Sequence, residues 1–598
     1  MTKNKAASPK PLTAPPAPDL DWSREGAPAS GSFNDIYFSV DGGLAETKAV
    51  FLKACGLPER WQERPVFVIG ELGFGSGLNF LAAWDLWTKT AAANQHLHFI
   101  SVEAYPWTAG DLRKALAAWP ELAPLTAQLI AAWPGRVRGL HRLHFGNVTL
   151  TLFHTDVDDA LTGMDARVDA WFLDGFSPSK NPDMWSDSVF AQLARLSNSG
   201  AQIGTFTVAG HVRSGLAQAG FTVSKKPGFG RKRERLEAVF PDTAVLQAQS
   251  TYPPIILGGG IAGASIANSF ARRGIAPVLI DPEPELNSAA SGNPAGLVMP
   301  RLDLQDRPES RFFLSAYLYA LSAYKQSNAV QQSGTVQLAQ TQKELTRFDK
   351  LAAQAPLPPS HMARISRTEA IAICGLNLCE GHGGLYFPYA QTIDPQAVIA
   401  AWTKPCTHIA DNAAHIKNQD GLWHVLNSHG ETLAVSDNVF VTVGANVLDL
   451  ADLDVRFTRG QICWGQSETP PKCALTYGGY ALPFDGGVLL GATHEHVGGG
   501  QKQATKPEDT QENIEQFFSL SGQSISEGDA GVRAAIRVTT KNTLPIAASI
   551  APGLNVISGL GSRGMMMAPL LGEALVSAAL GAPSPLDKQT LMRFNTPP

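Results

Sequence analysis

The stretch that decides the fold of the larger part of this chain reads Ile-Ile-Leu-Gly-Gly-Gly-Ile-Ala-Gly at residues 255–263 and Pro-Val-Leu-Ile-Asp at 277–281. An apolar, β-prone run leads into a Gly-x-Gly-x-x-Gly turn, apolar residues at helical spacing follow, and a second apolar run ends in an acid. This order predicts a βαβ unit that binds a dinucleotide, with the pyrophosphate at the helix N-terminus and a ribose diol on the acid. The residues expected to make these contacts are Gly258, Gly260, Gly263 and Asp281.

A second glycine loop lies in the N-terminal part of the chain. The apolar run 66–72 reads as a buried strand, Gly-Phe-Gly-Ser-Gly at 73–77 opens a helix, and the strand predicted at 97–102 is followed by an acid. Because the spacing is Gly-x-Gly-x-Gly and an acid stands before it, the loop suits the amino-acid part of S-adenosylmethionine better than a pyrophosphate. The residues expected to bind this cosubstrate are Glu71, Gly73, Gly75, Gly77 and Glu103.

Two further predicted strands in this part are also followed by acids. The strand at 149–153 precedes Asp156, and the strand at 168–173 ends at Asp174. Ligands bind at the carboxyl ends of the strands in an open parallel sheet, so we expect both acids to converge on the pocket that the glycine loop outlines. For one such acid, a turn cap or a solvated carboxylate explains the position equally well. The elements that follow complete a seven-stranded sheet of the methyltransferase type.

Residues 225–235 hold six cations and one anion between the last two predicted strands of this sheet, together with an exposed-looking Phe229. A basic hairpin is most often a solvated surface, but its place beside a predicted pocket favours contact with RNA phosphates. The net charge of −5 gives no global sign of nucleic-acid binding, so a basic surface must be local. The candidate RNA contacts are Lys225, Lys226, Arg231, Lys232 and Arg233.

The C-terminal part has the features of a flavoprotein. The apolar strand predicted at 439–446 is typical of one that returns to the nucleotide sheet, and a strand near 556 runs into a glycine turn and an apolar helix from about 568 to 580. The dipole at the N-terminus of that helix would stabilise an anionic reduced flavin. Small residues near 291 would let backbone amides approach the cofactor. Further flavin contacts are expected from Ser291, Gly292, Asn293, Gly561 and Gly564.

Length and composition indicate a large α/β protein without a membrane span. The 598 residues suffice for three or four folding units of about 150 residues each, and no apolar run is long enough to cross a bilayer. Six cysteines without a zinc spacing indicate reduced, buried thiols, no metal site and a cytoplasmic protein. We predict a disordered tail (1–20), a Rossmann-like methyltransferase domain (21–242), a linker (243–254) and an FAD-binding Rossmann domain (255–598) with a mixed α+β substrate subdomain inserted at about 330–435 and 455–530.

Several motifs together resemble one known family, the bifunctional tRNA 5-methylaminomethyl-2-thiouridine biosynthesis proteins. The C-terminal half resembles the glycine oxidase and D-amino-acid oxidase group. The likeness covers nearly the whole chain after the tail, although the sequence departs from relatives at Pro294 and at 537–545. The motifs that carry it are residues 33–38, 71–80, 172–176, 180–185 and 228–233 in the first half, and 258–263, 290–293, 531–533 and 559–564 in the second.

This resemblance implies two steps on the wobble uridine of certain tRNAs. The flavin half oxidises a carboxymethylaminomethyl group and releases glyoxylate, and the methyltransferase half methylates the resulting amine with S-adenosylmethionine. It further implies that Tyr480, Arg533 and Arg563 hold the substrate carboxylate, that Asp174 positions the amine, and that Phe176 stacks on the uracil. Either arginine could instead form a surface ion pair, and Phe176 could instead be a core residue.

Two other functions fit part of the pattern. An amine or amino-acid oxidase fused to a methyltransferase would keep both cofactors and make the basic hairpin incidental. A non-enzymatic tRNA-binding protein with decayed pockets is disfavoured by the intact glycine loops and by Asp174. We expect tRNA as the macromolecular partner, no DNA and no membrane, and a monomer.

Overall fold

The computed structural model describes residues 10–595 except 24–26, 39–41, 63, 231, 242–251, 284, 287–288, 380–382, 500–503, 527 and 529. The chain divides into two compact units. Ala14–Gln249 with Leu580–Lys588 form the methyltransferase-type unit, and Met1–Thr13, Ser250–Ala579 and Gln589–Pro598 form the oxidoreductase-type unit. The predicted linker therefore falls almost entirely outside the described residues, as does Arg231 of the basic hairpin.

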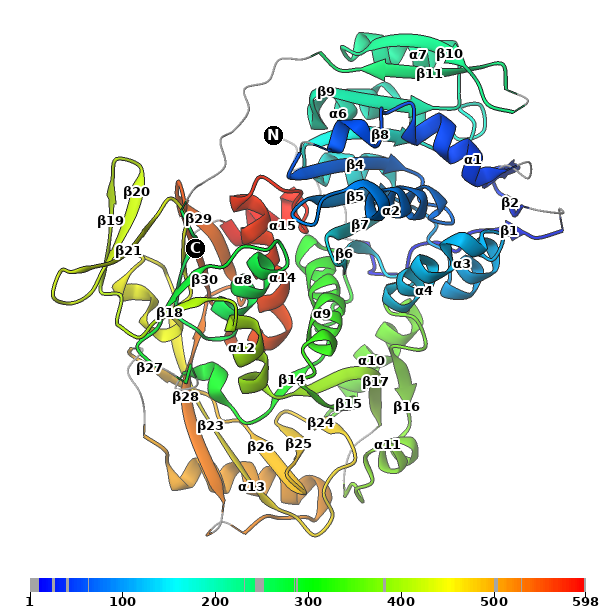
Figure 1. Cartoon of the computed structure of the whole chain (residues 1–598). Helices are drawn as coiled ribbons and strands as arrows, with labels where there is room; N and C mark the ends of the chain where they lie inside the picture. Colours follow the sequence, from blue (N-terminus) through cyan, green and yellow to red (C-terminus); the bar gives the residue numbers. More distant parts are fainter. Residues whose placement is uncertain are drawn as a thin grey trace, which may run out of the picture. The chain divides into compact units, whose positions relative to one another are not determined.

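The methyltransferase-type unit is built on an eight-stranded sheet with the order β10-β11-β9-β8-β4-β5-β7-β6. Its central strands are parallel, and helices cover both faces (Figure 1). We expected seven strands. The additional strand, β6, pairs antiparallel with β7 and was missed because His141 and Arg142, both buried, interrupt its apolar pattern. The strands are β4 (Val66–Leu72), β5 (His96–Val102), β6 (Gly139–Phe145), β7 (Val148–His154), β8 (Val168–Leu173), β9 (Ser197–Thr205), β10 (Thr222–Pro227) and β11 (Glu234–Val239).

Alternate residues of the same strands supply the two cores of this unit. Phe67 and Ile69 of β4 belong to one buried apolar cluster, whereas Val68 and Leu72 belong to the cluster on the other face of the sheet. This alternation follows from the period of two in a β-strand, and it makes a sheet with two buried faces. The covering helices are α2 (Leu78–Thr90), α3 (Ala109–Leu116), α4 (Ala123–Ala132), α5 (Val157–Gly163), α6 (Asp187–Leu196) and α7 (Gly210–Gln218).

The oxidoreductase-type unit has a nucleotide-binding sheet with the order β18-β13-β12-β22-β30-β29. The predicted βαβ unit forms as expected, and the predicted returning strand β22 pairs in parallel with both β12 and β30. Helices α8 and α14 pack against each other beside this sheet (Figure 1). The elements are β12 (Ile255–Leu257), α8 (Ile261–Ala271), β13 (Val278–Ile280), β18 (Thr407–Ile409), β22 (Val439–Val441), β29 (Ile546–Ala551), β30 (Leu554–Ser558) and α14 (Gly564–Ala579).

A ten-stranded mixed sheet is the largest sheet of this unit, and most of its strands lie within the ranges predicted for the inserted subdomain. It extends beyond the expected limits, because β14 (Gly296–Val298) begins it and β28 (Gly531–Thr539) pairs with its long strand β23 (Arg456–Gln466). The three-stranded sheet β19-β20-β21 within 415–436 instead packs the partly buried Ile416 and Trp423 against the core of the nucleotide-binding sheet. Two further strands of the ten-stranded sheet, β25 (Tyr480–Phe484) and β26 (Gly487–Gly491), pair antiparallel with each other.

Residues 10–20 of the tail that we expected to be disordered (1–20) have described positions, and residues 1–9 lie outside the described residues. Within the oxidoreductase-type unit, Pro11 bridges to Gln305, and the Leu12 amide donates to the carbonyl of Leu304 at 3.0 Å. Leu12 is fully buried, so its apolar side chain gives this segment a fixed place.

Four cysteines are buried as expected, but Cys379 is exposed and Cys406 is partly exposed. None of the helices in the described ranges is long and apolar enough to cross a membrane.

Candidate active sites

The first candidate site lies at the glycine loop between β4 and α2. All three predicted glycines have positive φ, at +93°, +50° and +78° for Gly73, Gly75 and Gly77. A Cβ at position 73 would lie 2.9 Å from the carbonyl oxygen of Asp174. Only glycine adopts this backbone conformation at such a close approach without strain, so the loop brings its amides next to the end of β8.

Three of the four predicted acids meet around this loop. Glu103 accepts hydrogen bonds from the Gly75 amide and the Tyr105 amide, both at 2.8 Å. Glu71 is buried at the end of β4 and accepts from the Ser101 hydroxyl at 2.6 Å. Asp174 lies at the end of β8, next to Gly73. The strand ends therefore converge as expected for an open parallel sheet.

Asn79, on the first turn of α2, links two of these acids and was missed by the sequence interpretation. Its amide nitrogen donates to Glu71 at 2.9 Å and to Asp174 at 2.7 Å, and its amide oxygen accepts from the Thr47 hydroxyl at 2.7 Å. Asn79 and Thr47 are both buried. Since the Thr47 hydroxyl meets the oxygen, the amide presents both N–H groups to the two carboxyl groups.

Burial dominates the electrostatics of the three acids. It raises the pKa of Asp174 to about 7, and the Asn79 amide acts in the opposite direction. Burial likewise raises the pKa of Glu71 well above its ordinary value, and that of Glu103 in the same direction. Such a group of acids fits a ligand that brings positive charge, and S-adenosylmethionine carries a sulfonium and an ammonium.

An aromatic wall stands beside Asp174. The Phe176 ring stacks on Phe33 at a centroid distance of 4.9 Å, and Tyr37 meets Phe176 edge-on at 5.0 Å. Phe176 is partly exposed, so it is not simply a core residue. The Trp185 indole N–H donates to the Phe176 carbonyl at 2.9 Å and fixes the loop that carries it.

Asp35 joins the two motifs that form this wall. Its carboxylate accepts from the Ser177 amide at 3.0 Å and lies 3.4 Å from the Lys180 ammonium. Lys180 also donates to the Asn34 carbonyl at 2.5 Å. Two segments about 140 residues apart in the sequence are thereby held together next to Asp174.

Asp156, which follows β7, caps the next helix. Its side chain is exposed and accepts from the Asp159 amide at 2.9 Å as the N-cap of α5. The alternative that we considered for a single acid, a cap, accounts for this hydrogen bond. A contact with the cosubstrate therefore remains a prediction for Asp156.

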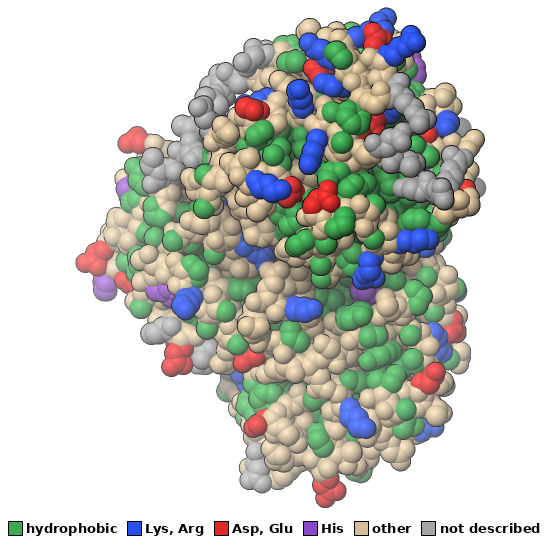
Figure 2. Space-filling view, turned by 45° about the vertical axis from the view of Figure 1, so that its right-hand side comes forward, with side chains coloured by type: hydrophobic (Ala, Val, Ile, Leu, Met, Phe, Trp, Pro, Cys, Tyr) green, Lys and Arg blue, Asp and Glu red, His purple; other side chains and the backbone are tan. Residues whose placement is uncertain are grey.

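The basic hairpin forms between β10 and β11, but part of its charge is paired. Lys225 bonds to Glu234 at 2.8 Å, and Lys232 bonds to Glu46 at 3.0 Å while lying over the Phe206 ring. Lys226 and Arg233 are exposed. Phe229, which looked exposed in the sequence, is partly buried against the core. On the face shown in Figure 2, Lys and Arg side chains are dispersed among other types.

The second candidate site is a cavity of about 1400 Å³ in the oxidoreductase-type unit. Its lining includes most of the residues predicted to contact a flavin dinucleotide, among them Gly258, Gly260, Asp281, Ser291, Asn293, Gly561 and Gly564. A Cβ at position 258 would lie 2.7 Å from the Thr442 carbonyl oxygen, and one at position 263 would lie 2.0 Å from the Gly258 carbonyl oxygen. The glycines therefore allow the close turn and helix packing that dinucleotide binding needs.

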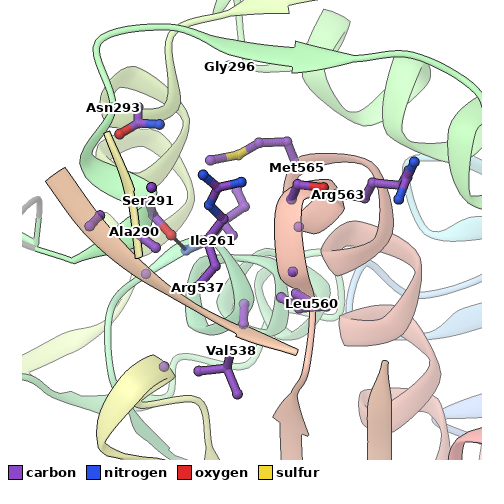
Figure 3. Close-up of a pocket in the computed structure, with 18 of the residues that line it drawn as sticks. Ile261, Ala290, Ser291, Asn293, Gly296, Arg537, Val538, Leu560, Arg563 and Met565 are labelled. Carbon is purple, nitrogen blue, oxygen red and sulfur yellow. Dashed lines mark hydrogen bonds between the residues drawn. The ribbon is translucent and has the colours of Figure 1, made fainter. Parts of the chain in front are cut away.

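Two side chains bond to backbone amides at the N-terminus of α8, where a cofactor is expected to bind. The Ser291 hydroxyl accepts from the Ile261 amide at 3.0 Å (Figure 3), and Asp281 accepts from the Gly259 amide at 2.6 Å. Gly292 is buried directly after Ser291. The N-terminus of α14 faces the same cavity through Arg563 to Met566, and this helix begins at Gly564, four residues earlier than predicted.

Arg537, and not Arg533, lies in this cavity with Tyr480. Arg533 donates to the Asn293 side chain at 2.9 Å and to the Ala289 carbonyl, and it is not among the residues that line the cavity. Arg537 is therefore the arginine of β28 that lines the cavity, and the carboxylate-binding role expected of Arg533 stays a prediction. Figure 3 shows the Arg537 side chain within the cavity, with Arg563 on another side of it.

Two glycines make room for this arrangement. A Cβ at Gly460 on β23 would lie 1.6 Å from the Arg537 guanidinium, and one at Gly491 on β26 would lie 2.4 Å from the Tyr480 ring. Burial raises the pKa of Tyr480, so its hydroxyl stays protonated and is able to donate a hydrogen bond. Burial lowers the pKa of Arg537, and the neighbouring Tyr480 acts in the opposite direction.

The comparisons with known proteins agree with both sites. Residues 120–241 match a family described as S-adenosyl-L-methionine-dependent methyltransferase, and residues 255–578 match one described as FAD dependent oxidoreductase. The tRNA 5-methylaminomethyl-2-thiouridine biosynthesis bifunctional protein MnmC of Caulobacter vibrioides is 41% identical, over 98% of this chain and 99% of the relative. That of Pseudomonas aeruginosa PAO1 is 36% identical, over 95% of each chain. The chain belongs to the MnmC family.

Membership of the MnmC family confirms the predicted fold class, the two enzymatic domains and the two cofactors, S-adenosylmethionine and FAD. Among solved structures, iminodiacetate oxidase from Chelativorans sp. BNC1 matches with a TM-score of 0.50 at 21% identity. The match covers 57% of this chain and 99% of that structure. At this identity it shows the fold of the oxidoreductase-type unit alone.

Proposed function

We propose that this protein carries out two consecutive reactions on the wobble uridine of tRNA. The oxidoreductase-type unit removes the carboxymethyl group from 5-carboxymethylaminomethyl-(2-thio)uridine, and the methyltransferase-type unit then methylates the 5-aminomethyl product. Curated MnmC relatives, named for tRNA 5-methylaminomethyl-2-thiouridine biosynthesis, match over nearly the whole chain and support this assignment. The chain would act in the cytoplasm as a monomer.

The oxidation step requires a substrate carboxylate to be held beside the flavin. FAD, when bound, accepts the hydride that leaves the carbon between the nitrogen and the carboxylate. We assign the carboxylate to Arg537, Tyr480 and Arg563, which line one cavity. A guanidinium offers a carboxylate two parallel hydrogen bonds, and the Tyr480 hydroxyl adds a third donor. Water then adds to the C=N bond, and glyoxylate leaves with cleavage of the carbon–nitrogen bond.

The methylation step requires a neutral amine close to the sulfonium methyl group. We assign Asp174 as the group that accepts the proton of the amine. Its pKa of about 7 means that it is partly ionised at neutral pH and basic enough to take up a proton. Its other contact, from Asn79, leaves one carboxylate oxygen for the amine. Phe176 and Phe33 would form the surface on which the uracil stacks, as single-stranded bases stack on aromatic side chains.

The single observation that carries the proposal is the presence, in one chain of this family, of Asp174 at the glycine loop and of Arg537 with Tyr480 in the dinucleotide cavity. Nucleoside mass spectrometry on hypomodified tRNA, incubated with the flavin-loaded protein, tests it directly. Without S-adenosylmethionine the carboxymethyl group should be lost, and with it one methyl group should be gained. Unchanged tRNA, together with hydrogen peroxide formed from free glycine or sarcosine, would indicate a small-molecule oxidase instead.

A further inference from the structure

A smaller cavity of about 510 Å³ lies in the oxidoreductase-type unit and is rich in arginine. Four guanidinium groups and two carboxylates line it, and the remaining lining residues are uncharged. The arginines come from four different parts of this unit, including α9 (Pro308–Gln326) with its preceding residue, α10 (Gln342–Gln354) and α15 (Lys588–Asn595). The charged lining residues are Arg301, Arg307, Arg347, Arg593, Asp303 and Glu309.

This arginine cavity adjoins the flavin cavity. Arg301, Asp303 and Arg347 line both spaces. Burial lowers the pKa of the Arg563 guanidinium, and the charge of Arg301 lowers it further. The residues on either side of Thr543, a lining residue of the flavin cavity, line the arginine cavity. A ligand that extends from the flavin cavity past Arg301 and Arg347 therefore reaches these guanidinium groups.

The positive charges of these arginines are only weakly neutralised by carboxylates of the protein. Arg301 and Arg593 each lie 3.9 Å from a carboxylate oxygen, the outer limit of an ion pair. In the described ranges, Arg307 and Arg347 have no carboxylate within ion-pair distance. Arg307 donates to the Gln305 side chain and Arg347 to the Leu302 carbonyl, both uncharged acceptors. The cavity thus carries excess positive charge in a protein whose net charge is −5.

We propose that the arginine cavity binds the phosphates that flank the target nucleotide while its modified base is in the flavin cavity. The proposal rests on the proposed function, because it takes RNA as the substrate. A base within an RNA chain is joined to phosphates on both sides, so these phosphates must lie at the mouth of the cavity that receives the base. Arginine suits this position because its planar fork bonds phosphate oxygens in pairs.

This assignment gives the oxidation step its own RNA contact. The basic hairpin belongs to the methyltransferase-type unit, next to Asp174. Phosphate contacts fix register without reading sequence, whereas the carboxylate contacts of Arg537 select the modified group. A free amino acid has no phosphate for the arginine cavity to bind. The cavity would therefore increase the affinity for an RNA substrate and not that for a free amino acid.

The test uses the full-length, flavin-loaded protein and a hypomodified tRNA whose binding is followed by fluorescence anisotropy over a range of KCl concentrations. The variant is Arg307→Ala with Arg593→Ala, which leaves the arginines shared with the flavin cavity in place. Each phosphate contact contributes roughly 0.7 to the slope of log K against log salt for single-stranded RNA, so the slope should fall by about 1.4. Arg272→Ala, at a partly exposed position that bonds Gln326, serves as the control and should leave the slope unchanged.

A second readout is the steady-state kinetics of oxidation. The double variant should raise the KM for tRNA and leave kcat unchanged, because uniform binding is lost while the reacting group is held as before. A slope equal to that of the wild type and of the Arg272→Ala control would overturn the arginine-cavity proposal alone. If the wild-type protein shows no salt-dependent binding of tRNA, the proposed function fails and this proposal fails with it.

Discussion

Replacing Asn79 with alanine tests how the methyltransferase-type site controls its proton acceptor. The Asn79 amide donates at 2.7 Å to Asp174 and stabilises its ionised form, so it lowers a pKa that burial raises to about 7. A hydrogen bond to a charged group contributes about 1.5–3 kcal/mol, and about 1.4 kcal/mol corresponds to one pKa unit. Losing the amide should therefore raise the pKa of Asp174 by roughly one to two units.

The sign of the effect on catalysis follows from this shift. Methylation requires ionised Asp174, so its rate rises with pH through the pKa of that group, and the variant should show the rise at higher pH. At pH 7 the ionised fraction should fall roughly five- to fifty-fold, whereas at pH 9 about half or more of the rate should return. The assay is transfer of a labelled methyl group to tRNA that carries the 5-aminomethyl group, measured from pH 6 to 9.5.

Two controls distinguish this role from a loss of structure. Thr47→Val removes the hydroxyl that bonds the Asn79 oxygen but leaves both amide donors facing the carboxyl groups, so its pH profile should move much less. Oxidation by the other unit of the same chain reports on folding and should not change. A uniform loss of methylation at every pH, with an unmoved midpoint, would refute the positioning role of Asn79.

Three further predictions concern the oxidoreductase-type unit. Arg537→Ala should reduce kcat/KM for oxidation by about a hundredfold or more while methylation is kept, because a charged hydrogen-bonded pair with the substrate is lost. Arg533→Ala removes hydrogen bonds to the Asn293 side chain and the Ala289 carbonyl and should cost less than tenfold in the same assay, and the reverse ranking would support the assignment from sequence. Gly460→Ala places a methyl group against the Arg537 guanidinium, so oxidation should fall as in Arg537→Ala although the flavin absorbance spectrum stays intact. Glu573→Ala leaves Arg273 buried without its partner at 2.7 Å and should lower the free energy of unfolding by about 3–5 kcal/mol in a denaturant titration, which a loss below 1 kcal/mol would contradict.

Local pattern was sufficient for much of the fold. The strand, glycine turn, helix and acid of each nucleotide-binding unit follow one another within about thirty residues, and each adopts the predicted structure. The apolar pattern did not predict β6, because buried polar residues interrupt it. It also gave no sign that Leu12, in a segment without other structural signals, is buried by the fold. Burial of a single residue depends on the surface it meets, which its neighbours in sequence do not specify.

The two arginines of β28 show the same limit within a site. Residues 533 and 537 point to the same face of the strand, because side chains alternate with a period of two, and they differ only by about 13 Å along it. Nothing in the segment itself says which one reaches the flavin cavity. The space is provided by Gly460, on a neighbouring strand more than seventy residues away, and the alternative position is fixed by Asn293.

The sequence by itself determined the two nucleotide folds, their cofactors and the acids at the strand ends, because glycine dihedrals, helix starts and strand ends are local properties of the chain. Only the tertiary structure decided which side chains act together. Asn79 joins Glu71 to Asp174, Phe33 stacks on Phe176, and Asp156 caps a helix. These relations depend on distances between segments that folding brings together, and the pKa of Asp174 is set by that burial.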